Sequence, residues 1–356
     1  MESINPQFHN QKRKQPLALS AYVQGILAGN RVILSQAITL VESTRADHQD
    51  LAQHIIEACL PYAGNSLRIG ITGAPGVGKS TFIEAFGMHI TEGGEGETKG
   101  KKLAVLAIDP SSQITKGSIL GDKTRMMHLS MNEKAFIRPS PAGDSLGGVA
   151  RKTRESIILC EAAGFDTIIV ETVGVGQSET AVHSMTDFFL LLLLPGAGDE
   201  LQGIKRGIVE RTDLIAVNKA DGEREKMAKQ AQAFYKNALH LLPSKPSNWT
   251  PQVVTCSAIS KLNIAHIWQL ILDYQRFTKE NNFFQTNRKA QAAYWLHESI
   301  EAALKKRFYQ DPSVKNHLKA IEKQVLEGKI TSFKGAEMIL KQWTKDKGQR
   351  TMDKGQ

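Results

Sequence analysis

The segment with the clearest chemistry is a glycine-rich run near residue 75. It reads Gly73-Ala74-Pro75-Gly76-Val77-Gly78-Lys79-Ser80 and matches the pattern GxxxxGK[ST]. Glycines at these positions let the backbone curl, so that successive N–H groups point at phosphates near the positive end of the following helix. The apolar run Leu67–Thr72 precedes the motif, and a helical pattern starts at Thr81. This strand-loop-helix context predicts a phosphate-binding loop rather than an ordinary glycine-rich turn.

Two side chains of this loop have expected roles. Lys79 is expected to reach the β and γ phosphates as a point charge, and the Ser80 hydroxyl is expected to coordinate Mg²⁺. The residues that the motif assigns to nucleotide binding are Gly73, Gly76, Val77, Gly78, Lys79 and Ser80.

A second motif, Asn218-Lys219-Ala220-Asp221, follows the apolar run Leu214–Val217 and matches NKxD. A carboxylate at Asp221 can accept from both N1–H and the exocyclic amine of guanine, whereas adenine offers no such pair of donors. Lys219 can lie along the plane of the base. Taken alone, the motif could be a helix cap, because Asn and Asp are common caps.

A further pair of residues supports guanine. Ser257-Ala258 follows the apolar run Val253–Cys256 and resembles the element of GTPases that supports the guanine carbonyl through a backbone N–H. Because both elements come after a phosphate loop and at the ends of later strands, the sequence favours GTP over ATP.

Three carboxylates stand where apolar runs give way to polar loops: Asp109, Asp122 and Glu171. Glu171 ends the run that begins at Thr167, where a carboxylate can face a phosphate-bound Mg²⁺ directly or through water. Gly174 follows at the position of the DxxG glycine, which donates its N–H to the γ-phosphate in GTPases. Here Glu replaces the Asp of that motif, and not all three carboxylates need to bind Mg²⁺ at once.

The elements that must position these residues can be read from the pattern of apolar runs. Runs that are apolar on both faces, separated by amphipathic segments, indicate a parallel sheet covered on both sides. We therefore expect an α/β fold of the P-loop NTPase type, a three-layer sandwich with a mostly parallel central sheet and helical extensions at both ends. The expected strands are Leu67–Thr72, Leu103–Ile108, Thr167–Val170, Phe188–Leu194, Leu214–Val217 and Val253–Cys256.

The chain divides into three expected regions. Residues 1–63 hold two or three helices ahead of the main domain, and residues 64–282 form the nucleotide-binding domain. Residues 283–356 form a helical region whose polar tail, from Lys345, is expected to be disordered. The helical segments expected after the last strand are Ile264–Phe277, Ala290–Tyr309, Ser313–Leu326 and Ser332–Thr344.

The composition of the chain limits which partners and which cellular compartment we expect. The chain has 356 residues and a formal charge of +9, but residues 286–356 hold 15 of the 45 Lys and Arg and only 8 of the 36 Asp and Glu. The nucleotide-binding body is therefore nearly neutral, and nucleic-acid binding is not needed to explain the charge. Cys59, Cys160 and Cys256 are far apart, and the longest apolar run ends at Pro195. We expect a cytoplasmic protein with no membrane partner.

Five stretches closely resemble the MeaB/ArgK family of GTPases. They are Ile108–Ser112, Gly117–Met126, Leu146–Ala150, Glu171–Glu179 and Pro195–Lys205. Members belong to the signal-recognition-particle and nitrogenase-iron-protein class and act as chaperones of adenosylcobalamin-dependent methylmalonyl-CoA mutase and related acyl-CoA mutases. The resemblance runs from about residue 17 to at least residue 275.

The resemblance implies roles for particular residues. Gly76–Gly78 with Lys79, Ser80 and Thr81 would bind phosphate, and Asn218, Lys219 and Asp221 would read guanine. Asp109, Asp122 and Glu171 would surround Mg²⁺. The segment Val173–Glu179 resembles the second switch, and Gly198–Lys205 resembles the segment by which this family senses the mutase. The family also works as a homodimer, to which the C-terminal helices contribute.

The expected mechanism is slow intrinsic hydrolysis of GTP to GDP and phosphate, because no Gln or Arg can be assigned as a catalytic finger. The bound mutase would order the switches, and the nucleotide state would gate cofactor loading and expulsion of inactivated cobalamin.

Three alternatives remain at this point. One is an ATPase or kinase associated with lysine, arginine and ornithine transport, which the guanine motif disfavours. A nickel- or zinc-insertion GTPase would carry clustered His or Cys residues, whereas the ten His here are dispersed. Nucleic-acid binding by the basic C-terminal region would need an aromatic stacking platform or a recognised motif.

Overall fold

The structure is a computed structural model that describes residues 16–93, 100–108, 126–139, 146–172, 178–196 and 206–352. The described residues form two compact units, with the division between Arg288 and Lys289. Within the described residues, no helix is both long enough and apolar enough to cross a bilayer.

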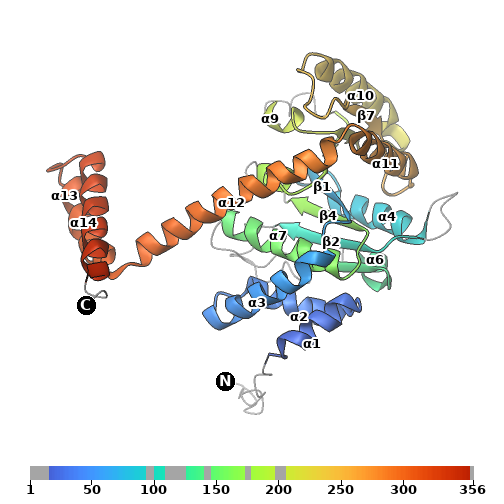
Figure 1. Cartoon of the computed structure of the whole chain (residues 1–356). Helices are drawn as coiled ribbons and strands as arrows, with labels where there is room; N and C mark the ends of the chain where they lie inside the picture. Colours follow the sequence, from blue (N-terminus) through green and yellow to red (C-terminus); the bar gives the residue numbers. More distant parts are fainter. Residues whose placement is uncertain are drawn as a thin grey trace, which may run out of the picture. The chain divides into compact units, whose positions relative to one another are not determined.

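Three helices precede the sheet, as expected. They are α1 (Leu19–Leu27), α2 (Arg31–Glu42) and α3 (Ala46–Cys59), followed by the short 3-10 helix η2 (Leu60–Tyr62). The Asn30 side chain accepts from the N–H groups of Val32 and Ile33, so it caps the first turn of α2. The helices α2 and α3 pack on α7 (Leu146–Ala162). The N-terminal extension thus covers part of the main domain rather than standing apart from it (Figure 1).

Seven strands form one sheet within the described residues, and every pairing is parallel. Their order across the sheet is β3-β2-β4-β1-β5-β6-β7. The bounds are β1 (Leu67–Gly73), β2 (Leu103–Ile108), β3 (Ala135–Arg138), β4 (Thr167–Thr172), β5 (Phe188–Leu193), β6 (Leu214–Val217) and β7 (Gln252–Thr255). The expected strands are confirmed, but β3 was missed because it is a four-residue edge strand with only three apolar residues.

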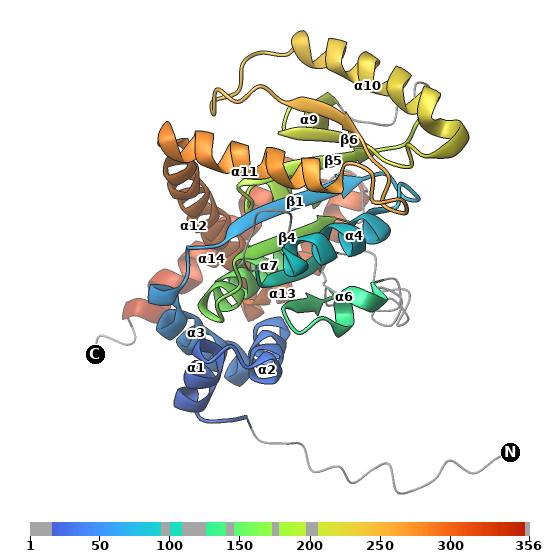
Figure 2. The same cartoon turned by 90° about the vertical axis from the view of Figure 1, so that its right-hand side faces the viewer.

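Helices cover both faces of the sheet, which confirms the three-layer α/β fold. On one face, α4 (Lys79–Glu92) and α11 (Ile264–Glu280) lie side by side over the central strands (Figures 1 and 2). The other face carries α7, α8 (Ser178–His183), α9 (Arg206–Val209) and α10 (Glu225–His240). Because both faces are buried, a strand such as β5 is apolar at every position.

The short helix α6 (Met127–Met131) is capped by a residue from α4. The side chain of its own N-cap residue, Met126, makes no capping hydrogen bond. Instead, the Glu84 carboxylate accepts from the N–H of His128 at 2.7 Å and from the N–H of Leu129 at 3.3 Å. The helix that follows the phosphate loop therefore also supports the start of α6.

Three helices follow α11. They are α12 (Phe283–Gln310), α13 (Pro312–Leu326) and α14 (Ser332–Met352), and α12 crosses the division between the two units. Asp311 caps α13 by accepting from the Ser313 N–H. The expectation of a disordered tail from Lys345 was wrong up to Met352, because α14 continues to that residue. Polarity suggested disorder, but this stretch contains mostly good helix formers and no proline.

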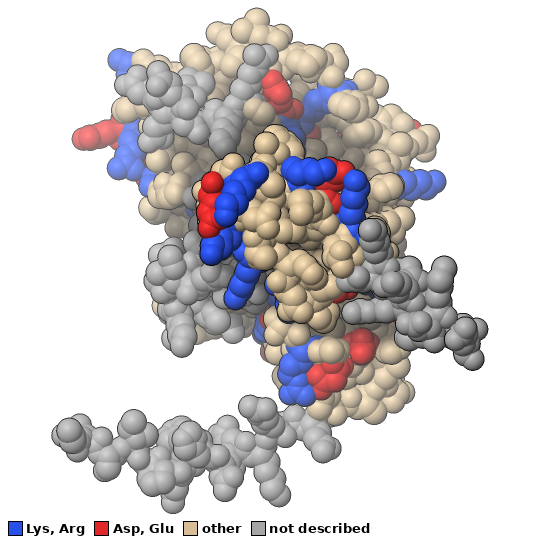
Figure 3. Space-filling model, turned by 90° about the vertical axis from the view of Figure 1, so that its left-hand side faces the viewer, with Lys and Arg blue, Asp and Glu red and all other residues tan. Residues whose placement is uncertain are grey.

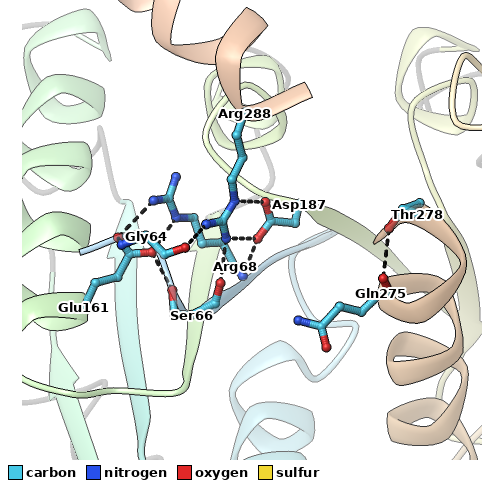
Figure 4. A network of polar contacts seen from close by, with 8 residues as sticks. All are labelled: Gly64, Ser66, Arg68, Glu161, Asp187, Gln275, Thr278 and Arg288. Carbon is cyan, nitrogen blue, oxygen red and sulfur yellow. Dashed lines mark hydrogen bonds and ion pairs between the residues drawn. The ribbon is translucent and has the colours of Figure 1, made fainter. Parts of the chain in front are cut away.

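A buried set of ion pairs attaches the start of α12 to the sheet (Figure 4). Arg288 donates from Nε to Asp187 Oδ1 at 2.7 Å and from Nη2 to Asp187 Oδ2 at 2.6 Å. The same guanidinium donates to the backbone carbonyls of Gly64 and Ser66. Burial lowers the pKa of Arg288, but its hydrogen bonds to Asp187 together with the negative charges of Asp187 and Glu161 outweigh that effect and raise it.

A second ion pair extends this set. Arg68 of β1 donates from Nε to Glu161 Oε1 at 2.8 Å, and its own N–H donates to Asp187 Oδ2 at 2.8 Å. Glu161 also accepts from the Gly64 N–H and the Ser66 hydroxyl. Burial tends to raise the pKa of Glu161, but these donors together hold it below its ordinary value. The network therefore connects α7, β1, β5 and α12 at the amino ends of the strands.

We predict that Arg288→Ala lowers the free energy of unfolding by about 3 kcal/mol or more, because it leaves the buried Asp187 carboxylate without the cation that it pairs with. Arg276→Ala is the matched control, since Arg276 forms an exposed ion pair with Asp273 on α11, and should cost less than about 1 kcal/mol. Urea unfolding of both variants gives the comparison. Equal losses would contradict the anchoring role of Arg288.

Candidate functional site

The glycine-rich motif forms the loop between β1 and α4, and two of its glycines are required by close neighbours. Gly78 precedes α4 in the left-handed region with φ 91°, where a side chain would be strained. A Cβ there would also lie 3.0 Å from Asn218 Nδ2. A Cβ on Gly73 would lie 2.6 Å from the Leu192 carbonyl oxygen on β5. The glycines therefore allow the loop to approach the next strands as well as to curl.

Lys79 is a buried cation at the start of α4. The residue is only 9% exposed, and Nζ donates to the carbonyls of Gly73 at 2.7 Å and Ala74 at 3.3 Å. Burial lowers the pKa of Lys79, while the charges of Glu171 and Glu179 oppose that change. Burial has the larger effect on this pKa. Additional negative charge beside Lys79 would therefore stabilise its charged form, and a polyphosphate would supply that charge.

Asn218, the first residue after β6, connects three segments. Its Nδ2 donates to the Val77 carbonyl of the phosphate loop at 2.9 Å. Its Oδ1 accepts from the Ala258 N–H at 3.2 Å and lies 3.7 Å from Cys256 Sγ. The residue is buried, so its amide is held between the phosphate loop and the segment after β7.

Lys219 makes the second contact with the phosphate loop. Its Nζ donates to the Gly76 carbonyl at 2.8 Å, and its backbone has φ 59°, an uncommon conformation for a residue with a side chain. Asn218 and Lys219 thus both bind backbone carbonyls of the loop, and their side chains do not occupy its N–H groups.

Asp221 is exposed and its carboxylate is not used as a cap. It precedes the 3-10 helix η4 (Gly222–Arg224), yet its side chain makes no capping hydrogen bond. The interpretation of this motif as a helix cap therefore has no support from the geometry. An exposed carboxylate beside the loop-binding residues Asn218 and Lys219 has the acceptor pair that guanine requires.

The Ser257-Ala258 segment follows β7 and is buried. Ser257 pairs with Leu262 through its N–H at 3.2 Å, and its Oγ accepts from the Ser260 N–H. We expected a backbone N–H of this segment to support the guanine carbonyl, and in this structure the N–H of Ala258 donates to Asn218 Oδ1. The segment therefore supports Asn218 directly.

Glu171 is the one member of the expected acidic set that the structure describes. It is 8% exposed and lies in β4 between Ile71 of β1 and Ala107 of β2. Asp109, Asp122 and Gly174 lie outside the described residues. Among the residues that are described, no group of three potential ligands forms a metal site.

The chemistry of the available donors nevertheless fits Mg²⁺. Ser80 is the second residue of α4, Glu171 precedes the last residue of β4, and Ile108, the residue before Asp109, ends β2. The carboxyl ends of these parallel strands meet at one edge of the sheet. Hydroxyl and carboxylate oxygens are the ligands that Mg²⁺ prefers.

Sequence reasoning missed the roles of two residues. Glu179 of α8 is buried, and its negative charge tends to raise the pKa of Lys79. Its place in the Glu171–Glu179 motif was the available signal. Cys256 contacts Asn218, and burial raises the pKa of its thiol to about 12, so it stays a neutral donor. Nothing in the spacing of the three cysteines pointed to this contact.

Comparisons with known proteins identify the family of this chain. A family model described as "Methylmalonyl Co-A mutase-associated GTPase MeaB" matches residues 34–313. The "GTPase ArgK" of Escherichia coli is 48% identical over 283 residues, which cover 80% of this chain and 84% of that protein. The "Methylmalonic aciduria type A homolog, mitochondrial" of Mus musculus is 42% identical over 327 residues, 89% of this chain and 77% of that protein.

A solved structure gives the same result for the fold. The "LAO/AO transport system kinase" is 36% identical, with a TM-score of 0.72, over 96% of this chain and 99% of that chain. The match of the family model to most of the sequence, together with relatives above 40% identity over most of the chain, is decisive. This chain therefore belongs to the MeaB family of methylmalonyl-CoA mutase-associated GTPases.

Proposed function

We propose that this GTPase uses its nucleotide state to control an adenosylcobalamin-dependent acyl-CoA mutase, most directly methylmalonyl-CoA mutase. In this role it gates cofactor loading and protects or reactivates the mutase. The observation that carries the nucleotide part is the attachment of Asn218 and Lys219 to the carbonyls of the phosphate loop. The mutase part is supported by the description of the family.

Different residues of the chain bind the phosphates and the base of GTP. The loop N–H groups and Lys79 bind the β and γ phosphates, and Lys79 exchanges its carbonyl contacts for phosphate oxygens. Asp221 accepts from the guanine edge, and Lys219 lies along the base. Gly174 is assigned the N–H that contacts the γ-phosphate, in line with its motif.

Ser80 and Glu171 are the described residues that would hold Mg²⁺, and Asp109 and Asp122 complete the proposed set. When bound, Mg²⁺ neutralises charge that develops between the β and γ phosphates. The backbone of Glu171 is paired with both β1 and β2, and this pairing fixes the position of the residue near the end of β4. No side chain is assigned as a catalytic finger, so the intrinsic hydrolysis is slow and the bound mutase speeds it by ordering the switches.

The C-terminal unit supports a homodimer. The helices α13 and α14, with the end of α12, enclose a mostly apolar groove of about 620 Å³, whose lining includes Leu318, Ile321, Val325, Leu326, Ile339 and Leu340. Leu326 and Phe333 are 87% and 86% exposed. On the face in Figure 3, Lys, Arg, Asp and Glu side chains border an area of uncharged residues. Exposed apolar area of this kind favours contact with another protein surface, here a second copy.

The transport-kinase alternative corresponds to the name of one solved relative, the "LAO/AO transport system kinase". It requires ATP, and adenine offers the exposed Asp221 carboxylate no matching pair of donors. The guanine-reading residues therefore favour the mutase-associated GTPase.

We predict that a purified acyl-CoA mutase raises the rate of GTP hydrolysis by about tenfold or more, because its binding orders the catalytic segments. Phosphate release is measured with and without methylmalonyl-CoA mutase. A Lys79→Ala variant should show almost no hydrolysis in either condition, which excludes a contaminating GTPase. No stimulation by any acyl-CoA mutase would contradict the proposal.

We also predict that the full chain sediments as a dimer and that Leu326→Glu shifts it toward monomer, because the new carboxylate would be buried in the interface. Met131→Glu is the matched control, since Met131 is an exposed apolar residue of the other unit, and it should leave the dimer unchanged. A wild-type chain that stays monomeric as its concentration rises would overturn the assignment.

A further inference from the structure

Two threonines at the base of the phosphate site form a buried hydroxyl pair. Thr172 Oγ1 donates to Thr72 Oγ1 at 2.8 Å. The two residues are 0% and 1% exposed. Thr72 directly precedes Gly73, where the phosphate loop begins, and Thr172 directly follows Glu171. The bond thus joins the two segments that bring phosphate-binding and metal-binding groups together.

The pair lies at the point where the backbone pairing of these two strands ends. The last paired residues of β1 and β4 are Ile71 and Glu171, whereas β1 remains paired with β5 as far as Gly73. One step beyond the last β1–β4 pair, the side chains of Thr72 and Thr172 take over the contact. The side-chain bond therefore extends the contact between β1 and β4 by one residue, from the Ile71–Glu171 pair to the residues directly before the phosphate loop and directly after Glu171.

The groups around the pair are those of the nucleotide site. On the β1 side, the Gly73 carbonyl accepts from Lys79 Nζ. On the β4 side, the negative charge of the Glu171 carboxylate tends to raise the pKa of Lys79. Valine is favoured in strands at least as much as threonine, so strand preference alone does not require hydroxyls at both positions. Each hydroxyl offers the other a partner in a site that water does not reach.

We propose that Thr72 and Thr172 are positioning residues that hold Glu171 in register with the phosphate loop. The proposal rests on the proposed binding of Mg²⁺-GTP at this site and adds two residues to it. Neither threonine contacts the nucleotide in this account. Their effect passes through Glu171 and Gly73, so losing the bond changes the metal-dependent step more than nucleotide binding itself.

The experiment compares single and double valine variants. Thr172→Val and Thr72→Val should each lower kcat for GTP hydrolysis by about tenfold or more, because small displacements of catalytic groups have large effects on rate. Both should raise the Mg²⁺ concentration needed for half-maximal rate. The affinity for GDP measured without Mg²⁺ should stay within about twofold of wild type.

Two further variants serve as controls. Thr172→Ser keeps the hydroxyl and should restore most of the rate. Thr167→Val makes the same change at the other end of β4, where the Thr167 hydroxyl is buried without a hydrogen-bond partner in the described part of the chain. This variant should match wild type in kcat and in its Mg²⁺ dependence.

The double variant separates positioning from stability. Replacing both hydroxyls leaves no buried donor or acceptor without a partner, so Thr72→Val combined with Thr172→Val should unfold at a midpoint close to that of wild type. It should nevertheless keep the low kcat. Recovery of the wild-type rate in the double variant, or single variants that behave like Thr167→Val, would overturn the proposal while leaving GTP hydrolysis by the wild type intact. A wild type without Mg²⁺-dependent GTP hydrolysis would overturn the proposed function as well.

Discussion

The hydrogen bond from the Asn218 amide to the Val77 carbonyl joins the segment proposed to read the base to the phosphate loop. These residues are 141 positions apart in the chain, and β5 lies between the strands that precede them. They meet because all the strands are parallel, so their carboxyl ends lie at one edge of the sheet. Gly78 has no side chain to block this approach. Through Asn218, this junction connects the phosphate loop with the Ala258 segment after β7.

The charged side chains at the two ends of the sheet differ in the partners with which they form hydrogen bonds. At the amino ends of the strands, Arg288, Asp187, Arg68 and Glu161 satisfy one another through short hydrogen bonds. At the carboxyl ends, Lys79 is buried against backbone carbonyls, and burial outweighs the opposing carboxylates. The first arrangement contributes stability, whereas the second leaves charge that a ligand can satisfy. The fold thus separates the part that holds the helices from the part that binds the nucleotide.

Much of the site was predictable from the sequence because its motifs are local. The phosphate loop and the Asn218–Asp221 segment each lie within a few residues, and the apolar runs located six strands correctly. The missed features depend on residues distant in sequence. Thr72 and Thr172 look like ordinary strand residues, and only the register of β1 and β4 brings their hydroxyls together. The contact of Cys256 with Asn218 also joins residues that are distant in sequence. The short edge strand β3 carries too few apolar residues to be recognised. The roles of Asp109, Asp122 and Gly174 remain predictions from sequence.

We propose that Asp221, beside the Asn218 junction, reads the guanine edge. The most direct test measures by calorimetry the affinities of the wild type and Asp221→Asn for GDP, ADP and xanthosine diphosphate. Xanthine keeps N1–H but replaces the exocyclic amine with a carbonyl, which an Asn amide can match and a carboxylate cannot. We expect the wild type to prefer GDP by about a hundredfold or more and Asp221→Asn to prefer xanthosine diphosphate. Equal binding of GDP and ADP by the wild type, or an unchanged preference in the variant, would contradict it.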